Sequence, residues 1–243
     1  MTTAVMTPRK ARIQPDRIFF PLMCLTILVT AWLGFSKTYY AAGMVTAHLP
    51  APIIHLHAAV MTLWLLTLTV QTSLVSVRKV KLHMAVGLWG FALAAILLPI
   101  GTLAAIDSLR RDFTAAWSGL SPLTFFVIPI SSLVAFAVLA AWSYSVRRKP
   151  DQHKRLIVLA TIPLLDAAVG RFPTTLGIGA SPMAQLWIIC IFPAALIVYD
   201  LISRRKIQRV TWMGTLILLV VWLTRIPLAQ TAPWQAFARL VHG

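Results

Sequence analysis

The chain contains the stretch PIIHLHAAVMTLWLLTLTVQTSLVSV at residues 52–77 and, after the short basic connector RKVKL, the stretch HMAVGLWGFALAAILLPIGTLAAI at residues 83–106. The hydrocarbon core of a bilayer is about 30 Å thick, and a helix that crosses it needs about 20 predominantly apolar residues. Both stretches exceed that length, and Lys and Arg are confined to the connector between them. The pattern predicts two transmembrane helices joined by a tight, positively charged turn.

The same alternation of apolar stretch and connector extends over the rest of the chain. Of the 243 residues, 59% are hydrophobic and only 12% are charged, whereas a soluble domain has about 25% charged residues. The mean hydropathy is +0.82, so the helices lack the polar surface that water requires and are expected to contact a lipid bilayer. We predict an all-α, polytopic integral membrane protein, a seven-transmembrane-helix bundle with spans at residues 18–36, 52–77, 83–106, 121–146, 153–173, 182–203 and 210–229.

Basic residues gather in every second connector, which predicts the orientation of the bundle. Most of the 22 Lys and Arg residues lie in the N-terminal leader or in the connectors after the predicted second, fourth and sixth spans. Cytoplasmic connectors are enriched in Lys and Arg, so we expect the N-terminus inside and the C-terminus outside. The expected division is a cytoplasmic basic leader at residues 1–17, a transmembrane domain at 18–229 and a short outer C-terminal tail at 230–243.

The basic composition and the first span each admit another interpretation. A net charge of +16 is typical of proteins that bind nucleic acid, but short basic clusters between apolar spans serve orientation in a bilayer. We therefore predict no nucleic-acid partner. The first span could instead be a cleaved signal sequence, because the small residues Ala41, Ala42 and Gly43 follow it. Its apolar stretch is longer than the core of about 7–15 residues in a signal peptide, which favours a retained helix.

Ionisable side chains inside a span are costly in lipid and mark candidate functional sites. His83 and His153 begin the third and fifth predicted spans, both on the basic side of the membrane. His83 shares a helical face with Gly87 and Gly90, which leave room for a flat group. Two imidazoles from different helices, with space beside them, suit the axial positions of a b-type haem. Basic residues nearby are expected to meet the haem propionates: Lys79, Lys81, Lys154 and Arg155. Alternatively, the histidines are polar caps at the interface, and the small residues only permit close helix packing.

A second group of polar residues is predicted on the opposite side of the membrane. His57 and Trp64 share one face of the second span, and Asp166 and Arg171 lie toward the outer end of the fifth. These four residues form an expected pocket for a small molecule. The spacing of His55 and His57 also suits a copper or zinc ion, although two rings so spaced diverge by about 200° on a regular helix.

The chain has six acidic residues, and all of them are Asp. We expect Asp200 to pair with Arg204, which lies one turn further along the same helix. For Asp166 a partner on another helix is favoured, with His57 as the best candidate. The two acidic residues of the third connector are expected to pair with the arginines that they flank: Asp107 and Asp112 with Arg110 and Arg111.

Three features connect the chain with known proteins: the segment HLHAAVMTLWLLTLTVQTSLVSVRKVKLHMAVGLWG at residues 55–90, the segment RRKPDQHKRLIVLATIPLLDAAVGRFP at residues 147–173, and the pair Tyr39 and Tyr40 after the first span. Through them the chain resembles, over nearly its whole length, a widespread family of uncharacterised bacterial inner-membrane proteins. The resemblance implies a multi-pass protein of the bacterial cytoplasmic (inner) membrane and brings no established activity.

The positions of His57, His83 and His153 are also similar to the ligand pattern of the cytochrome b561 group. That group places one His at the start of a span and, after a basic connector, another His at the start of the next. Here the predicted fourth span, residues 121–146, contains no His. The resemblance therefore implies at most one haem, on the basic side between the third and fifth spans.

These observations predict an integral membrane protein that binds one b-type haem for membrane electron transfer or haem-linked assembly. One alternative is a small-molecule transporter or binding protein that uses the outer pocket. Another is a non-catalytic subunit or assembly factor of a membrane complex. Whether the protein is an enzyme does not follow from its residues.

Overall fold

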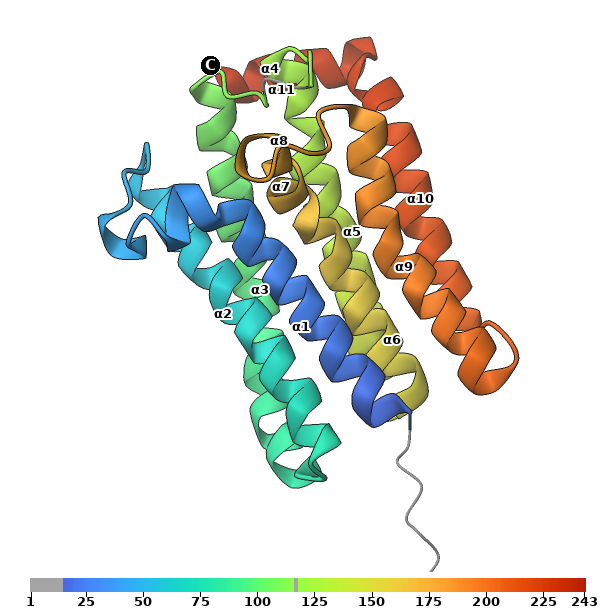
Figure 1. The fold of residues 1–243 in the computed structure, drawn as a ribbon. Helices are drawn as coiled ribbons and strands as arrows, with labels where there is room; N and C mark the ends of the chain where they lie inside the picture. The colour runs from blue at the N-terminus through green and yellow to red at the C-terminus, as the bar shows by residue number, and fades with distance from the viewer. Residues whose placement is uncertain (1–14, 116–117) are drawn as a thin grey trace, which may run out of the picture.

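Two stretches of the chain, residues 15–115 and 118–243, are described by a computed structural model, and their regular structure is helical (Figure 1). Six helical stretches in these ranges are long and apolar enough to cross a membrane. The protein is therefore an all-helical, multi-pass membrane protein whose outer surface contacts lipid. Most of the predicted basic leader, residues 1–14, lies outside the described ranges, as do residues 116–117.

The helices of the first half follow the predicted spans closely, apart from the third, which extends further at both ends. In chain order the elements are α1 (Asp16–Phe35), the π-helical turn η1 (Ser36–Tyr40), the 3₁₀ turn η2 (Met44–Thr46), α2 (Pro52–Ser76), α3 (Val80–Arg110), α4 (Pro122–Phe125) and α5 (Val127–Ser145). α3 takes in charged residues at each end, because the long side chains of Lys and Arg can reach the polar interface from a helix terminus. His83 consequently lies inside the first turns of α3 and does not open it.

The second half contains the elements α6 (Pro150–Thr161), η3 (Ile162–Leu165), α7 (Asp166–Val169), α8 (Phe172–Thr175), α9 (Pro182–Arg204), α10 (Arg209–Ala229) and α11 (Ala232–His242). Local sequence sets the limits of α9. The Ser181 hydroxyl accepts a hydrogen bond from the backbone N–H of Ala184 at 3.2 Å, and Pro182 occupies the first turn, both of which are typical of a helix N-terminus. Arg205 ends α9 in the left-handed conformation, with φ 58°.

The predicted fifth span, residues 153–173, is not one uninterrupted helix. It is divided into α6, the 3₁₀ turn η3 and the short α7, and α8 follows after Gly170 and Arg171. The break falls at Pro163, where the missing N–H and the ring of proline oppose a continuous α-helix. For this reason the six membrane-length helices of the described residues do not include this segment.

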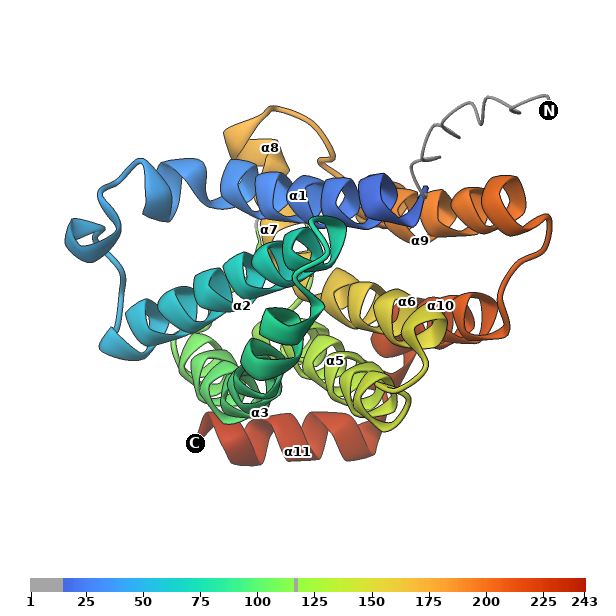
Figure 2. The ribbon, with the colours of Figure 1, turned by 90° about the horizontal axis from the view of Figure 1, so that it is seen from below.

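This broken segment forms the centre of the bundle. Every residue from Arg155 to Leu165 is buried, and the end-on view shows α6 enclosed by the other helices, with α1, α5 and α10 against it (Figure 2). In a bilayer a broken helix is tolerated where neighbouring protein surrounds it. Its burial therefore explains how this segment can interrupt its α-helix inside the bundle.

The basic connectors all lie at one end of the bundle, which we call the basic end. The start of α1, the α2–α3 turn, the α5–α6 turn and the α9–α10 turn are together there, whereas α4, α8 and α11 lie at the opposite end (Figure 1). The segment from α6 through α7 runs from the basic end toward the opposite end. The predicted outer tail, residues 230–243, is largely helical: α11 packs across the opposite end against α3 and α4.

One glycine permits a close contact between α1 and the central segment. A Cβ atom added at Gly34 would lie 2.4 Å from the backbone oxygen of Ala168 in α7. Real Cβ atoms do not approach oxygen so closely, so only glycine allows the two backbones to meet there. This contact holds the broken segment against α1 in the half of the bundle away from the basic connectors.

Candidate functional site

Two histidines predicted to share a site are adjacent in the structure. The ring centres of His83 in α3 and His153 in α6 lie 6.5 Å apart, and their planes meet at 64°. The Phe91 ring lies 6.0 Å from the His153 ring and 4.9 Å from the Tyr144 ring. Two imidazoles from helices that are far apart in sequence therefore meet near the basic end, beside an aromatic wall.

Hydrogen bonds set which ring nitrogen of His153 carries the proton. Its Nδ1 lies 2.9 Å from the Ser143 hydroxyl oxygen and 3.2 Å from the Ser143 carbonyl oxygen. The Ser143 hydroxyl in turn lies in donating position to the His153 carbonyl, at 3.2 Å. Because a carbonyl can only accept, Nδ1 is the protonated nitrogen of the neutral ring. Nε2 then presents a lone pair, as a metal ligand requires.

Gln71 of α2 holds the other ring. In the amide orientation that satisfies both of its polar atoms, Gln71 donates to the His83 carbonyl at 3.1 Å and to His83 Nδ1 at 2.5 Å, and accepts from the Gly87 N–H at 3.3 Å. Nδ1 of His83 is then an acceptor and Nε2 carries the proton. Rotating the Gln71 amide by half a turn would let its oxygen accept from a protonated Nδ1 and free Nε2, but it would also set that oxygen against the His83 carbonyl and the NH2 against the Gly87 N–H.

The strip of small residues on α3 divides into an open part and a packed part. A Cβ atom added at Gly87 would meet no atom within 4 Å, and one at Gly90 would meet only a Thr67 methyl at 3.4 Å. A Cβ atom at Gly101 would lie 2.8 Å from the Leu133 side chain of α5. The strip thus leaves space beside His83 and serves helix packing further along α3.

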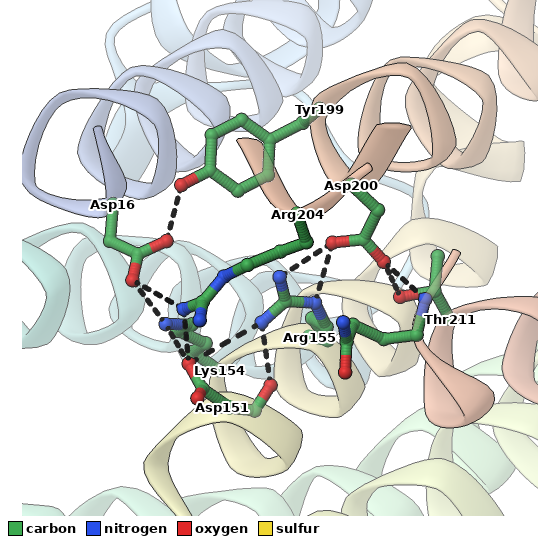
Figure 3. A network of polar contacts seen from close by, with 9 residues as sticks. Asp16, Asp151, Lys154, Arg155, Tyr199, Asp200, Arg204 and Thr211 are labelled. Atoms are coloured by element: carbon green, nitrogen blue, oxygen red, sulfur yellow. Dashed lines mark hydrogen bonds and ion pairs between the residues drawn. The ribbon is translucent and has the colours of Figure 1, made fainter. Parts of the chain in front are cut away.

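The basic end is held by a network of charged and polar side chains from four helices (Figure 3). At its centre Arg155 of α6 and Asp200 of α9 are both fully buried, with 2.5 Å between Nη2 and the carboxylate. Asp200 also accepts from the Arg155 Nε at 2.9 Å, the Gln208 N–H at 3.0 Å and the Thr211 hydroxyl at 2.6 Å. Every lone pair of this carboxylate therefore has a donor, which offsets the cost of burying the charge.

The prediction that Asp200 pairs with Arg204 is wrong. Arg204 instead bonds Asp151 at 2.9 Å and Asp16 at 3.3 Å. Asp200 faces the bundle interior, where the buried Arg155 is within reach. A charge paired in a low-dielectric interior interacts more strongly than one paired at the surface, so the tertiary contact replaces the neighbour on the same helix.

The outer part of the network joins the start of α1 to α6 and α9. Lys154 bonds both Asp16 and Asp151 at 2.7 Å, and the Tyr199 hydroxyl donates to Asp16. The hydrogen bond from Lys154 lowers the pKa of Asp151, and the charges of Lys154, Arg204 and Arg155 act in the same direction against partial desolvation. Lys154 and Arg155 are thus occupied by carboxylates, so only the exposed Lys79 and Lys81 remain of the cations expected at haem propionates.

Asp166 does not bond His57, the partner favoured from the sequence. Its carboxylate accepts from Ser132 of α5 at 2.7 Å and from Arg225 of α10 at 2.6 Å. Sequence reasoning missed Arg225, although an arginine inside a predicted span is itself a signal. The carboxylate lies in α7 and faces α5 and α10, because the 3₁₀ turn before it changes the direction of the side chain relative to a continuous helix.

The other members of the predicted outer pocket are partly brought together. Arg171 donates to the Ala167 carbonyl at 2.6 Å and covers the Phe35 ring at 4.3 Å. The charge of Arg171 is near enough to act on His57. Among the described residues, His57 Nδ1 and Trp64 Nε1 are buried polar atoms without a hydrogen-bond partner. Buried polar groups are usually bonded, so these two atoms mark a place where a ligand group would be accommodated.

His55 and His57, the predicted copper or zinc pair, both lie in α2, whose α-helix begins at Pro52. Within the described ranges, no three metal-binding side chains of His, Cys, Asp or Glu converge. An ion shared by these two rings stays a prediction of the sequence. Of the acidic residues in the third connector, Asp107 bonds Arg111 at 2.7 Å, as expected, whereas Asp112 bonds His242 of α11 at 3.1 Å.

The fold and these contacts define the class of protein: a multi-pass helical membrane protein with charge-paired side chains at both ends of its bundle and a histidine pair between α3 and α6. Comparison with protein families, with curated proteins and with solved structures finds no match to this chain. Any proposal on its function rests on the site itself.

Proposed function

We propose that the protein crosses the bacterial cytoplasmic membrane seven times, with its N-terminus inside and its C-terminus outside. The support is the position of the described ends: α1 starts at the basic end and α11 lies at the opposite end (Figure 1), which favours an odd number of passes. The segment α6–η3–α7 supplies the seventh pass. Alkaline phosphatase fused after Gly243 is expected to be active, and green fluorescent protein fused there to be dark; the reverse result would establish an even number of passes.

We infer that the histidine pair binds one b-type haem. The observation that carries this proposal is the 6.5 Å separation of the His83 and His153 ring centres. An iron held by two imidazole nitrogens at about 2.0 Å places the ring centres about 6 Å apart. The space beside Gly87 favours a flat group.

The residues of this chain have distinct parts in such a site. Ser143 fixes the His153 ring with Nε2 available. The Gln71 amide donates to His83 Nδ1 and so places the proton of the neutral ring on Nε2, which means that iron binding by His83 requires this contact to rearrange. Second-sphere hydrogen bonds of this kind orient ligand rings and adjust their basicity. A bound haem would supply one-electron chemistry, which suits membrane electron transfer or haem-linked assembly. Lys79 and Lys81, next to the site along the chain, are the expected partners of the propionates.

An optical spectrum tests the haem proposal directly. Protein purified from cells supplied with ample haem is expected to show a Soret band and a reduced-minus-oxidised difference spectrum. His83→Ala and His153→Ala should each abolish both signals, whereas His242→Ala at the opposite end should keep them. Ser143→Ala should retain haem but shift its redox potential. Absence of a Soret band, or its persistence in both histidine variants, contradicts the proposal.

A second candidate function is the binding or transport of a small molecule from the opposite end, and it is favoured by the unpartnered Nδ1 of His57 and Nε1 of Trp64. Together with the Arg171 cation these groups suit a small carboxylate. Asp166 is neutralised by Arg225 and does not oppose an anion there. A thermal-shift screen with acetate and succinate is expected to find stabilisation that Trp64→Phe weakens and that Trp187→Phe, on the exposed face of α9, leaves unchanged.

The same two variants separate this candidate from the haem proposal, because neither tryptophan belongs to the His83–His153 site. A third role, as a non-catalytic subunit or assembly factor, predicts that a further membrane protein co-purifies in constant ratio with the chain. No contact in the structure favours that role over the other two.

A further inference from the structure

An apolar groove of about 650 Å³ runs along the outside of the bundle between α1 and α9. Both helices lie on the same face of the molecule (Figure 2). The rims are exposed: Ile18 and Leu22 of α1 are each 56% exposed and Ile191 of α9 is 62% exposed. The floor is formed by buried side chains of three elements, Met23, Phe172 and Phe192. The groove is therefore open toward lipid and closed toward the core.

The polar atoms that line the groove are already bonded within α1. The Thr26 hydroxyl donates to the Leu22 carbonyl at 2.9 Å, and the Thr30 hydroxyl donates to the Thr26 carbonyl at 2.8 Å. The Pro15 carbonyl accepts from the N–H groups of Ile18 and Phe19. A ligand in the groove would gain no hydrogen bond from these groups, so the lining fits a hydrocarbon chain.

The dimensions of the groove match a single acyl chain. Its lining extends along α1 from Pro15 to Thr30, about 22 Å at 1.5 Å per residue, which exceeds the roughly 15 Å of one leaflet's hydrocarbon. If a methylene occupies about the volume of a water molecule, ~30 Å³, a chain of about 16 carbons fills about 480 Å³. A transmembrane helix of a partner would need several times that volume to enter the groove.

One end of the groove lies at the basic end of the bundle, where the charges are unequal. The network of Figure 3 balances Asp16, Asp151 and Asp200 against three cations. Other basic residues that adjoin this network along the chain form no ion pair within the described ranges: Arg17, Arg205 and Lys206. The groove begins at Pro15, and the neighbouring Asp16 bonds Arg204 at the end of α9. Its basic end is therefore close to the uncompensated charges of Arg205 and Lys206, whereas Arg17 lies on the opposite face of α1.

We propose that the groove binds one acyl chain of an anionic phospholipid, whose headgroup is held by Arg205 and Lys206. Apolar walls select the hydrocarbon, and the cations select the negative headgroup. Basic clusters at the cytoplasmic ends of transmembrane helices attract anionic lipids in this way. This proposal is independent of the haem site, because the groove lies between α1 and α9 and the histidines lie on α3 and α6.

Native mass spectrometry of the full chain in detergent, titrated with phosphatidylglycerol or phosphatidylcholine, tests the proposal. Wild-type protein is expected to retain phosphatidylglycerol preferentially. Ala195→Trp, which projects a ring into the groove, should weaken retention about tenfold or more, because each buried methylene contributes about fourfold in affinity. Leu223→Trp, on the exposed face of α10, is the matched control and should change nothing.

Charge variants test the headgroup contacts separately. Arg205→Gln with Lys206→Gln should reduce phosphatidylglycerol binding about 25-fold, since each cation contributes about fivefold near an anionic headgroup, and should leave phosphatidylcholine unaffected. Within the described ranges neither side chain forms an ion pair, so folding should be intact, which the thermal midpoint checks. Equal retention of both lipids, no effect of Ala195→Trp, or a mass spectrum in which the groove variant dissociates a second copy of the chain would each overturn the proposal.

Discussion

The two ends of the bundle each contain an Asp–Arg pair between separate helices, but the pairs differ in their surroundings. Arg155 and Asp200, at the basic end, are both 0% exposed. Arg225 and Asp166, toward the other end, are 16% and 12% exposed. The basic-end carboxylate also has donors from Thr211 and the backbone, whereas Asp166 has only Ser132 in addition to arginine.

The difference indicates that the two ends have different tasks. At the basic end, four helices are joined by a network with balanced charge, which suits a rigid frame for the nearby histidine pair. Among the described residues, His57 Nδ1 and Trp64 Nε1 of α2 have no hydrogen-bond partner, which suits a region that accepts a ligand; at the basic end Ser203 Oγ is also unpartnered. Substitutions in each Asp–Arg pair test whether the two ends of the bundle differ in this way.

The largest effect is expected at the basic end. Asp200→Ala leaves the Arg155 guanidinium buried without its main counter-charge, and removal of one partner of a buried pair typically costs about 3–5 kcal/mol. The free energy of unfolding, measured by denaturant titration in detergent, should fall by this amount. The double variant Arg155→Met with Asp200→Leu should recover most of the loss, because it removes both charges and preserves volume. An unchanged Asp200→Ala protein would contradict the structural part assigned to this pair.

A smaller loss is expected for Asp166→Asn. The carboxylate accepts charge-assisted hydrogen bonds from Arg225 and Ser132, and such bonds contribute about 1.5–3 kcal/mol. Partial exposure allows the Arg225 guanidinium to find water, so the loss should stay below that of Asp200→Ala in the same titration. If the two variants are equally unstable, the contrast between the ends is wrong.

Two glycine substitutions compare packing with open space. Gly34→Ala forces a Cβ against the Ala168 carbonyl and should destabilise by about 1–3 kcal/mol, as overpacking does. Gly87→Ala meets no atom within 4 Å and should be neutral or stabilising by up to about 1 kcal/mol, because alanine favours a helix over glycine. The thermal midpoints of the two variants give the measurement. A loss at Gly87 equal to that at Gly34 would show that the space beside His83 is filled.

The smallest effect concerns pH. The hydrogen bond from Lys154 lowers the pKa of Asp151 below the ordinary value of an aspartate. Ionised Asp151 therefore favours the folded state at pH values above the pKa that it has in the unfolded chain. This contribution is lost as pH falls through the lowered pKa of the folded state. The thermal midpoint of wild type should therefore decrease more steeply between pH 5 and about pH 3 than that of Asp151→Asn. Parallel curves would show that this exposed carboxylate does not contribute.

The sequence predicts the membrane-length helices well, because length and hydropathy are properties of one segment at a time. The central segment is the exception. Its length and composition predict a simple span, yet Pro163 and complete burial produce a helix in pieces. The basic connectors, which alternate along the sequence, all lie at one end of the bundle. The histidines of α3 and α6 were predicted at equal depth, and they are neighbours in the structure.

The charge pairs were less predictable. The pairing of Asp107 with Arg111 is confirmed because both lie on one helix surface, where positions four apart are neighbours. For Asp200, the same spacing argument named Arg204, which is the wrong partner. For Asp166, the choice of a residue at similar membrane depth named His57, which is also wrong. Their true partners, Arg155 and Arg225, were visible as arginines inside predicted spans, but nothing in the linear order indicates which helices face each other.

By itself the sequence determines the class of this protein, the approximate helix limits and the end at which positive charge collects, since each depends on local composition. The tertiary structure alone decides which carboxylate meets which cation, how close the two imidazoles lie and where a groove opens between α1 and α9. The physical reason is that buried charges and packed surfaces are satisfied by side chains of other helices, and the choice of neighbouring helices belongs to the assembled bundle.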